Sequence, residues 1–281
     1  MEQTAGKPIP GCLYRPHIPS DLLLSLNDRA PQLRLAEDRL TVSGEKGYST
    51  IRSTVGVSLG CWFYEVTMNE MIRPGAARIG WVQNSANLQA PVGYDKFGYA
   101  FRSRFGSAFT NSRGHHYAEN GYGPGDTIGC LICLPLKPTE KERAISDFLP
   151  PHCKDLPLVK FKGNLYYEER DQAAELEKQL KPLPNSYIEF FKNGVSMGKA
   201  WQDIPSGVYY IGVSLYKNVT CRVNPGPNFK FPPPQIADGE SIDRTVRPMS
   251  EATQASAVWH SMVDILYHIE NENNPPDFLS S

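Results

Sequence analysis

Residues that could perform catalysis are scattered along this 281-residue sequence instead of forming a recognisable motif. The sequence holds no GxSxG, HExxH, GxGxxG or GxxxxGK[ST] pattern, the signatures of hydrolases, zinc proteases and phosphate-binding loops. Its one histidine pair, His115-His116, lies in a polar stretch that is typical of a surface loop. Adjacent carboxylates occur in turn-like or charged surroundings, at Glu37-Asp38 and at Glu168-Glu169. We therefore predict a protein that is not an enzyme, with no catalytic residue and no cofactor.

The six cysteines include one CxxC pair, Cys130 and Cys133. This pair lies in the apolar run 129–134, which is typical of a buried strand, and strand positions three apart face opposite sides. A shared metal is therefore disfavoured, although a zinc or redox pair stays the minor alternative. The N-terminus shows no secretory signal, so a reducing compartment and free thiols are expected.

Arginine and tyrosine recur in loops of the first half of the chain. Tyr48 follows Gly44-Glu45-Lys46-Gly47, Arg78 begins an apolar run, and Arg102 ends another. Between these lies the Pro/Gly/Tyr turn 91–96. Arg and Tyr on rigid loops are typical of protein-binding hot spots, and guanidinium groups pair with carboxylate or phosphate. The alternative is that each of these residues stands alone on the surface.

Runs with a period of two dominate the elements that would position these residues. Strands are expected at 22–26, where one turn of helix is the alternative, and at 33–35, 40–42, 60–66, 77–82, 98–102, 127–134, 187–192, 207–215 and 219–223. Asn193-Gly194 between two such runs predicts a tight hairpin. The fold class is therefore all-β, a sandwich or barrel. A net charge of −1 argues against nucleic-acid binding as the main task, and no apolar run is long enough to cross a membrane.

The chain divides by composition into five parts. Residues 1–20 are an irregular lead-in, and residues 21–234 form the β domain, whose charged block 137–182 is expected to be a partly helical or mobile insertion. A catalytic lid within this block is an alternative. Residues 235–249 read as a polar linker, 250–270 as a helix and 271–281 as a tail.

Six segments in order resemble a SPRY domain: Gly60–Val66, Arg78–Trp81, Leu88–Arg102, Tyr122–Cys130, Phe190–Gly194 with Gly198, and Gly207–Leu215 followed by Asn224-Pro225-Gly226. The resemblance implies a bent, antiparallel two-sheet β-sandwich that binds peptides through its loops. Three further segments resemble the SPRY subunits of the trithorax-group (SET/COMPASS) histone methyltransferase complexes: Asp28–Leu33, Gly44–Ser49 and Asn87–Phe97. The segment Tyr267–Glu270 also resembles the tail of these subunits.

This closer resemblance implies a nuclear, non-catalytic scaffold that takes part in chromatin and transcription regulation. Such a scaffold pairs with a WD-repeat retinoblastoma-binding subunit and helps activate a SET-domain methyltransferase on lysine four of histone three, meeting the nucleosome only indirectly. By position, the residues that grip an acidic or phosphorylated segment of the WD-repeat partner are Tyr48, Arg78, Pro91, Tyr94 and Arg102.

The predicted C-terminal helix carries apolar residues at helical spacing, namely Val258, Met262, Ile265, Leu266 and Ile269. The resemblance assigns this face to a small dumpy-thirty-type helical dimer, and the alternative is packing against the sandwich. Two rival functions stay open for the whole chain. One is a SPRY substrate adaptor of a ubiquitin ligase, and the other is an enzyme with an unrecognised site in the 137–182 block.

Overall fold

The computed structural model describes residues 21–135, 158–167, 173–233 and 245–254, which belong to two compact units. The larger unit comprises residues 19–137 and 173–253. Its strands are β1 (Leu24–Arg29), β2 (Leu33–Leu35), β3 (Thr41–Gly44), β4 (Ser49–Val57), β5 (Gly60–Met71), β6 (Ala76–Gln83), β7 (Gly98–Arg102), β8 (Ser107–Thr110), β9 (Arg113–His116), β10 (Thr127–Leu134), β13 (Tyr187–Lys192), β14 (Val195–Gln202), β15 (Tyr209–Tyr216), β16 (Val219–Asn224) and β17 (Val246–Pro248). This confirms the prediction of an all-β fold.

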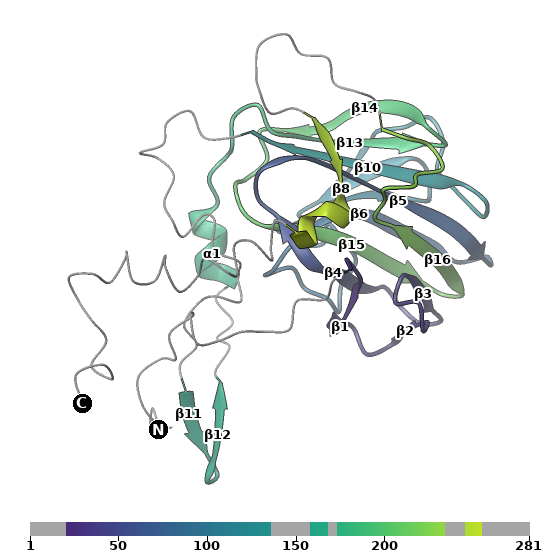
Figure 1. Ribbon diagram of the computed structural model, residues 1–281. Helices are drawn as coiled ribbons and strands as arrows, with labels where there is room; N and C mark the ends of the chain where they lie inside the picture. Colours follow the sequence, from purple (N-terminus) through teal and green to yellow (C-terminus); the bar gives the residue numbers. More distant parts are fainter. Residues whose placement is uncertain (1–20, 136–157, 168–172, 234–244, 255–281) are drawn as a thin grey trace. The chain divides into compact units, whose positions relative to one another are not determined.

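The strands of the larger unit form two sheets (Figure 1). One sheet has the order β1-β4-β15-β6-β7-β8-β9, and every pair in it is antiparallel. The other has the order β14-β13-β10-β5-β16-β3-β2, with β17 added beside β5. β17 pairs with β5 in parallel, whereas the other pairs of that sheet are antiparallel. The predicted antiparallel sandwich is therefore confirmed, with one parallel pair that the sequence did not predict.

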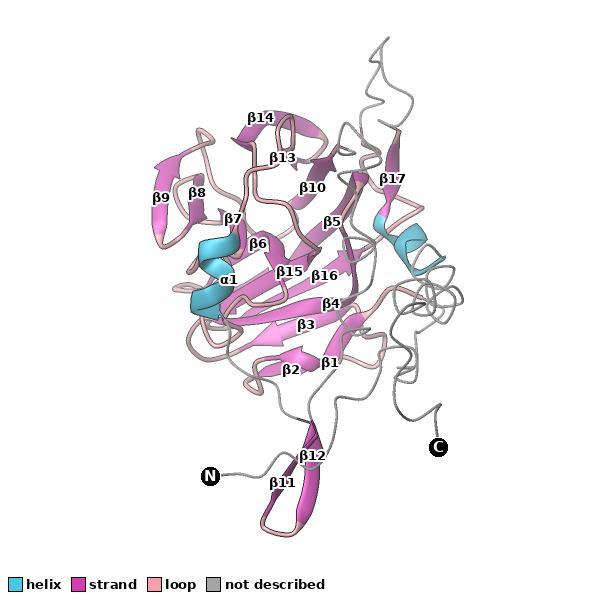
Figure 2. Cartoon of the chain, turned by 90° about the vertical axis from the view of Figure 1, so that its left-hand side faces the viewer, coloured by secondary structure: helices cyan, strands magenta, loops and turns pink. Residues whose placement is uncertain are grey.

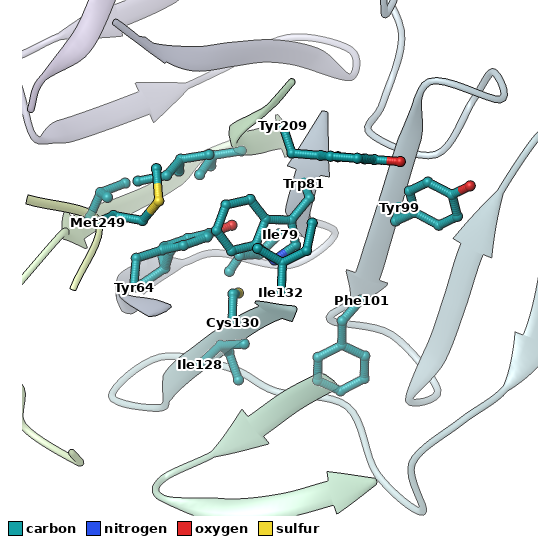
Figure 3. Close-up of a cluster of buried hydrophobic side chains, with 14 of the residues drawn as sticks. Tyr64, Ile79, Trp81, Tyr99, Phe101, Ile128, Cys130, Ile132, Tyr209 and Met249 are labelled. Carbon is teal, nitrogen blue, oxygen red and sulfur yellow. The ribbon is translucent and has the colours of Figure 1, made fainter. Parts of the chain in front are cut away.

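Large aromatic side chains fill the space between the two sheets (Figure 3). Trp81 from one sheet and Tyr64 from the other are fully buried, and their rings meet edge-on with centroids 4.9 Å apart. The Tyr64 hydroxyl donates a hydrogen bond to the carbonyl oxygen of Gly80, which satisfies the polar end of the buried ring. These contacts pack β5 of one sheet against β6 of the other, and β6 is the strand that carries Arg78.

Side chains alternate between the two faces of β10, and this places its two cysteines on opposite sides of the sheet. Cys130 lies in the core between the sheets, whereas Cys133 lies in a second cluster on the opposite face of its sheet. The prediction that these two thiols face opposite sides is confirmed. The expectation of free thiols is wrong for Cys133, which forms a disulfide with Cys61 directly opposite it on β5. Among the described cysteines, Cys130 and Cys221 are free and buried.

The hairpin between β13 and β14 forms at Asn193-Gly194, as the sequence predicts. Both residues have positive φ, 51° and 82°, which is the geometry that a type I′ turn requires. His115-His116 is exposed, but it lies in the edge strand β9 and not in a loop, so that detail of the prediction is wrong. β9 pairs with β8 across a tight turn.

The charged block 137–182 contains regular structure in its described part. β11 (Leu158–Phe161) and β12 (Asn164–Tyr167) form a two-stranded hairpin in the smaller unit, which the sequence did not predict. A short helix, α1 (Ala173–Gln179), belongs to the larger unit. The Lys96 ammonium lies 2.5 Å from the Glu177 carboxylate, and this ion pair ties α1 to the loop that follows Tyr94.

The segment that the sequence predicts as a linker, 235–249, is only partly a linker. Val246–Pro248 forms β17 beside the first residues of β5, and a 3-10 helix (Met249–Glu251) follows it (Figure 2). Met249 is fully buried in the core, and Ala252 is also buried. The prediction is therefore wrong for residues 246–249, because apolar side chains anchor this end of the segment. The predicted helix residues 255–270 and the tail 271–281 lie outside the described residues.

Candidate peptide-binding site

Two arginines lie directly opposite each other on neighbouring interior strands of the first sheet. Arg78 on β6 and Arg102 on β7 are register partners in an antiparallel pair, so their side chains leave the sheet on the same face. Both side chains are half-buried. Like charges directly opposite each other are normally unfavourable, so this pair needs a compensating environment.

The ring of Phe109, on β8, lies against both guanidinium groups. The Arg78 Cζ is 3.9 Å from the ring centroid, and the Arg102 Cζ is 5.6 Å from it. Such cation–π contacts stabilise a positive charge that has lost part of its water. The Tyr48 ring adds a further contact, with its centroid 5.4 Å from the Arg78 Cζ. We call Tyr48, Arg78, Arg102 and Phe109 the arginine cluster.

Burial and charge act together on Arg78. Loss of water lowers the pKa of the Arg78 guanidinium, Tyr48 opposes this effect, and the positive charge of Arg102 lowers the pKa further. The buried Nε atoms of Arg78 and Arg102 have no hydrogen-bond partner. No carboxylate in the described part of the chain forms an ion pair with either arginine. The two guanidinium groups therefore contact aromatic rings but no carboxylate within the described part of the chain.

The loop with Pro91 and Tyr94 is tied to the cluster through its backbone. Arg78 Nη1 donates to the carbonyl oxygen of Val92 at 3.2 Å. Within the loop, the Tyr94 amide donates to the carbonyl oxygen of Pro91 at 3.0 Å, which closes a turn. The Tyr94 side chain is 52% exposed, so its ring is available to a ligand.

The turn between β8 and β9 fixes the other side of this loop. The Ser112 hydroxyl donates to the carbonyl oxygen of Tyr94 at 2.7 Å, and the Ser112 amide donates to that of Gly93 at 2.9 Å. Gly93 has a φ of 79°, and a Cβ there would lie 2.4 Å from the carbonyl oxygen of Phe109. Only glycine fits this close approach, so the backbone of the loop packs directly against that of β8.

The structure therefore brings Tyr48, Arg78 and Arg102 into contact, and it connects Pro91 and Tyr94 to them through Val92. Sequence reasoning missed Phe109 and Tyr216, whose ring centroid is 5.0 Å from that of Tyr48. Phe109 lies in a four-residue strand too short to give a clear period, whereas Tyr216 follows the predicted strand 207–215 directly. The predicted dimer-binding residues Val258, Met262, Ile265, Leu266 and Ile269 lie outside the described residues.

Within the part of the chain that the structure covers, no cluster of three or more His, Cys, Asp or Glu residues could hold a metal ion. No helix there is long and apolar enough to cross a membrane. Two arginines beside aromatic rings can donate hydrogen bonds to an anion such as a carboxylate or a phosphate.

A comparison with protein-family models identifies one domain within the chain. The SPRY domain family matches residues 61–135, which span β5 to β10 and include Arg78, Tyr94 and Arg102. Over these residues the chain is similar to the SPRY domain, in keeping with the antiparallel sandwich that the structure shows.

Its relatives include subunits of one kind of complex. The chain is 47% identical over 268 residues to the "Set1/Ash2 histone methyltransferase complex subunit ASH2" of Drosophila melanogaster, covering 95% of this chain and 46% of that protein. It is 39% identical to the "Set1/Ash2 histone methyltransferase complex subunit ash-2" of Caenorhabditis elegans, covering 82% and 40%. It is 27% identical to the "Set1 complex component ash2" of Schizosaccharomyces pombe, covering 96% and 45%. The chain thus spans about half the length or less of these relatives.

Proposed function

We propose that this chain is a non-catalytic scaffold subunit of a nuclear histone lysine methyltransferase complex. In this proposal the arginine cluster binds an acidic or phosphorylated segment of the WD-repeat partner, with Pro91 and Tyr94 beside it. The names of its relatives, which are subunits of Set1/Ash2 histone methyltransferase complexes, support membership of such a complex. Binding the WD-repeat partner then helps activate the SET-domain methyltransferase on lysine four of histone three.

One observation carries the binding proposal. Arg78 and Arg102 face each other across β6 and β7, half-buried, with two Nε atoms that have no hydrogen-bond partner. A carboxylate or phosphate would accept hydrogen bonds from both guanidinium forks and would offset the repulsion between the two charges. The rings of Phe109 and Tyr48 hold the arginines in place before binding, which reduces the entropy lost when a ligand docks.

The remaining partners follow from the resemblance and from the sequence of the tail. We propose that Val258, Met262, Ile265, Leu266 and Ile269 form the face of a helix that holds the small helical dimer. Their helical spacing supports this assignment. Contact with the nucleosome is indirect in this scheme, through the other subunits.

Calorimetric titration tests the binding site directly. A peptide of mixed Asp and Glu, and its phosphoserine counterpart, are titrated into the chain at low and at high salt. A charge-assisted hydrogen bond contributes about 1.5–3 kcal/mol, so Arg102→Ala should weaken binding about tenfold or more. High salt should reduce this difference, because it screens charges that are only half-buried.

Arg222→Ala is the matched control. Arg222 is an exposed arginine on β16, in the other sheet, and its ion pair is with Asp38. This variant loses the same charge without touching the cluster, so its affinity should stay close to that of the unmodified chain. The proposal is wrong if Arg78→Ala combined with Arg102→Ala leaves the affinity unchanged while circular dichroism shows an intact fold.

A further inference from the structure

Two apolar side chains are exposed in the loops that follow β5 and β7. Ile72 is 61% exposed and Phe105 is 78% exposed. The loops that carry them are joined, because Arg104 Nη2 donates hydrogen bonds to the carbonyl oxygens of Pro74 and Gly75. We call Ile72, Arg73, Pro74, Arg104 and Phe105 the terminal patch.

Phe105 is held in a backbone conformation that aromatic residues rarely adopt. Its φ is 59°, and it is the one aromatic residue with positive φ in the described ranges. The next residue is fixed as well, because the amides of Tyr117 and Ala118 donate to the carbonyl oxygen of Gly106 at 3.1 and 2.8 Å. Strain of this kind persists where the surroundings enforce it, and it concentrates at binding sites. Since the ring is mostly exposed, packing within the chain does not account for a phenylalanine here.

The terminal patch lies next to the arginine cluster along the chain, because Arg104 and Phe105 follow Arg102 at the end of β7. Beyond the Arg78–Arg102 pair, the Ser103 amide donates to the carbonyl oxygen of Ala77 at 2.9 Å, so the pairing continues toward Arg104. Phe105 is three residues past Arg102, which in an extended chain is a distance of about 10 Å. A bound extended segment would cover this distance with about three of its own residues.

We propose that the terminal patch binds an apolar side chain of the same acidic segment that the arginine cluster binds, about three residues from the acidic run. This inference rests on the proposed function and names the sequence class of the ligand: acidic residues flanked on one side by an aromatic or aliphatic residue. Arg73 and Arg104 border the apolar side chains and favour a ligand of negative charge. A second copy of the chain is disfavoured, because a two-fold contact would bring these arginines against each other.

Three peptides test the inference. The first carries the acidic run alone, the second adds a phenylalanine about three residues before the run, and the third adds it about three residues after the run. Affinities are measured by calorimetry with the complete chain. We expect one of the two longer peptides to bind about five- to tenfold more tightly than the first, which is the gain from partly burying one apolar side chain.

The informative variant is Phe105→Asn. Asparagine tolerates positive φ, so this variant should fold at least as well as the unmodified chain and melt at the same temperature or higher. It should lose the five- to tenfold gain with the longer peptide and keep its affinity for the acidic run within about twofold. Val195→Asn is the control, because Val195 is 68% exposed on β14 in the other sheet. This control should keep the full gain.

Several results would overturn the inference. If neither longer peptide binds more tightly, or if Phe105→Asn keeps the gain, the terminal patch does not contact the segment, while binding of the acidic run still supports the proposed function. If sedimentation shows self-association that Phe105→Asn abolishes, the occupant is a second copy. If the unmodified chain binds none of the three peptides, the proposed function and this inference both fail.

Discussion

Phe109 offers the sharpest test of how the arginine cluster works, because it carries no charge. The substitution Phe109→Leu removes the ring that lies 3.9 Å from the Arg78 Cζ and 5.6 Å from the Arg102 Cζ, and it leaves both cations in place. The ring also packs against the backbone of Gly114, where an added Cβ would lie 2.6 Å from the Phe109 Cζ. Without it, both guanidinium groups gain freedom in the unbound chain.

The expected loss of affinity follows from the greater freedom of the two arginine side chains in the unbound variant. Ordering one flexible side chain on binding costs about 0.5–1.5 kcal/mol, so two arginines that are no longer held cost about 1–3 kcal/mol. This corresponds to an affinity for the acidic peptide that is lower by about 5- to 150-fold. A cation–π contact is worth about 0.5–2 kcal/mol, so the free energy of unfolding should also fall by an amount in that range.

The assay is calorimetric titration of the acidic peptide at several salt concentrations, with circular dichroism as the check on folding. Phe109→Leu should shift the affinity at every salt concentration by the same factor, because the number of charges is unchanged. Arg102→Ala, by contrast, should flatten the salt dependence. An affinity of Phe109→Leu equal to that of the unmodified chain, with the fold intact, would refute the reasoning that aromatic packing positions the arginines.

Three further predictions concern catalysis, the tail and acid stability. The isolated chain should transfer no methyl group to histone peptides in a radiometric assay, and it should raise the rate of a SET-domain subunit when the WD-repeat partner is present; turnover by the chain alone would contradict this. Leu266→Glu should abolish capture of the small helical dimer in a pull-down and leave acidic-peptide binding unchanged, and normal capture would contradict the assignment. Burial raises the pKa of Asp38, but hydrogen bonds from Leu40, Thr41 and Arg222 outweigh it and lower the pKa to about 2. The pKa of Asp38 in the folded chain lies below its ordinary value of 3.8, so the ionised carboxylate stabilises the fold fully above pH 3.8, and this contribution is lost as the pH falls toward 2. The melting temperature of Asp38→Asn should therefore fall less between these two pH values than that of the unmodified chain.

The sequence predicted those features that depend on residues close together in the chain, such as the alternation of a strand or the turn of a hairpin. The alternation around Cys130 predicted that the thiols of Cys130 and Cys133 face opposite sides, and Asn193-Gly194 marked a hairpin because few residues tolerate its two positive φ angles. Tyr48, Arg78 and Arg102 could be singled out as arginine and tyrosine expected in or beside loops, although the structure places Arg78 and Arg102 within β6 and β7. Their mutual contact is a consequence of the β6–β7 register, which the sequence does not display.

The features that the sequence did not predict depend on contacts between distant segments. The partner of Cys133 is 72 residues away, and only the pairing of β5 with β10 brings the two sulfurs together. Phe109 gains its role from the arginines of two other strands. Val246–Pro248 has no periodic pattern of its own and becomes a strand because the first residues of β5 offer it a free edge.

The position of β17 changes how deletions of the C-terminal region must be interpreted. A fragment that ends at residue 234 lacks the predicted tail helix, but it also lacks β17 and the fully buried Met249. Removing a buried methionine side chain typically costs about 2–5 kcal/mol, which is a large share of the stability of an ordinary domain. Loss of binding in such a fragment would therefore report damage to the sandwich as much as loss of a docking helix. A truncation that separates the two effects has to begin after Thr253, where the anchored segment ends.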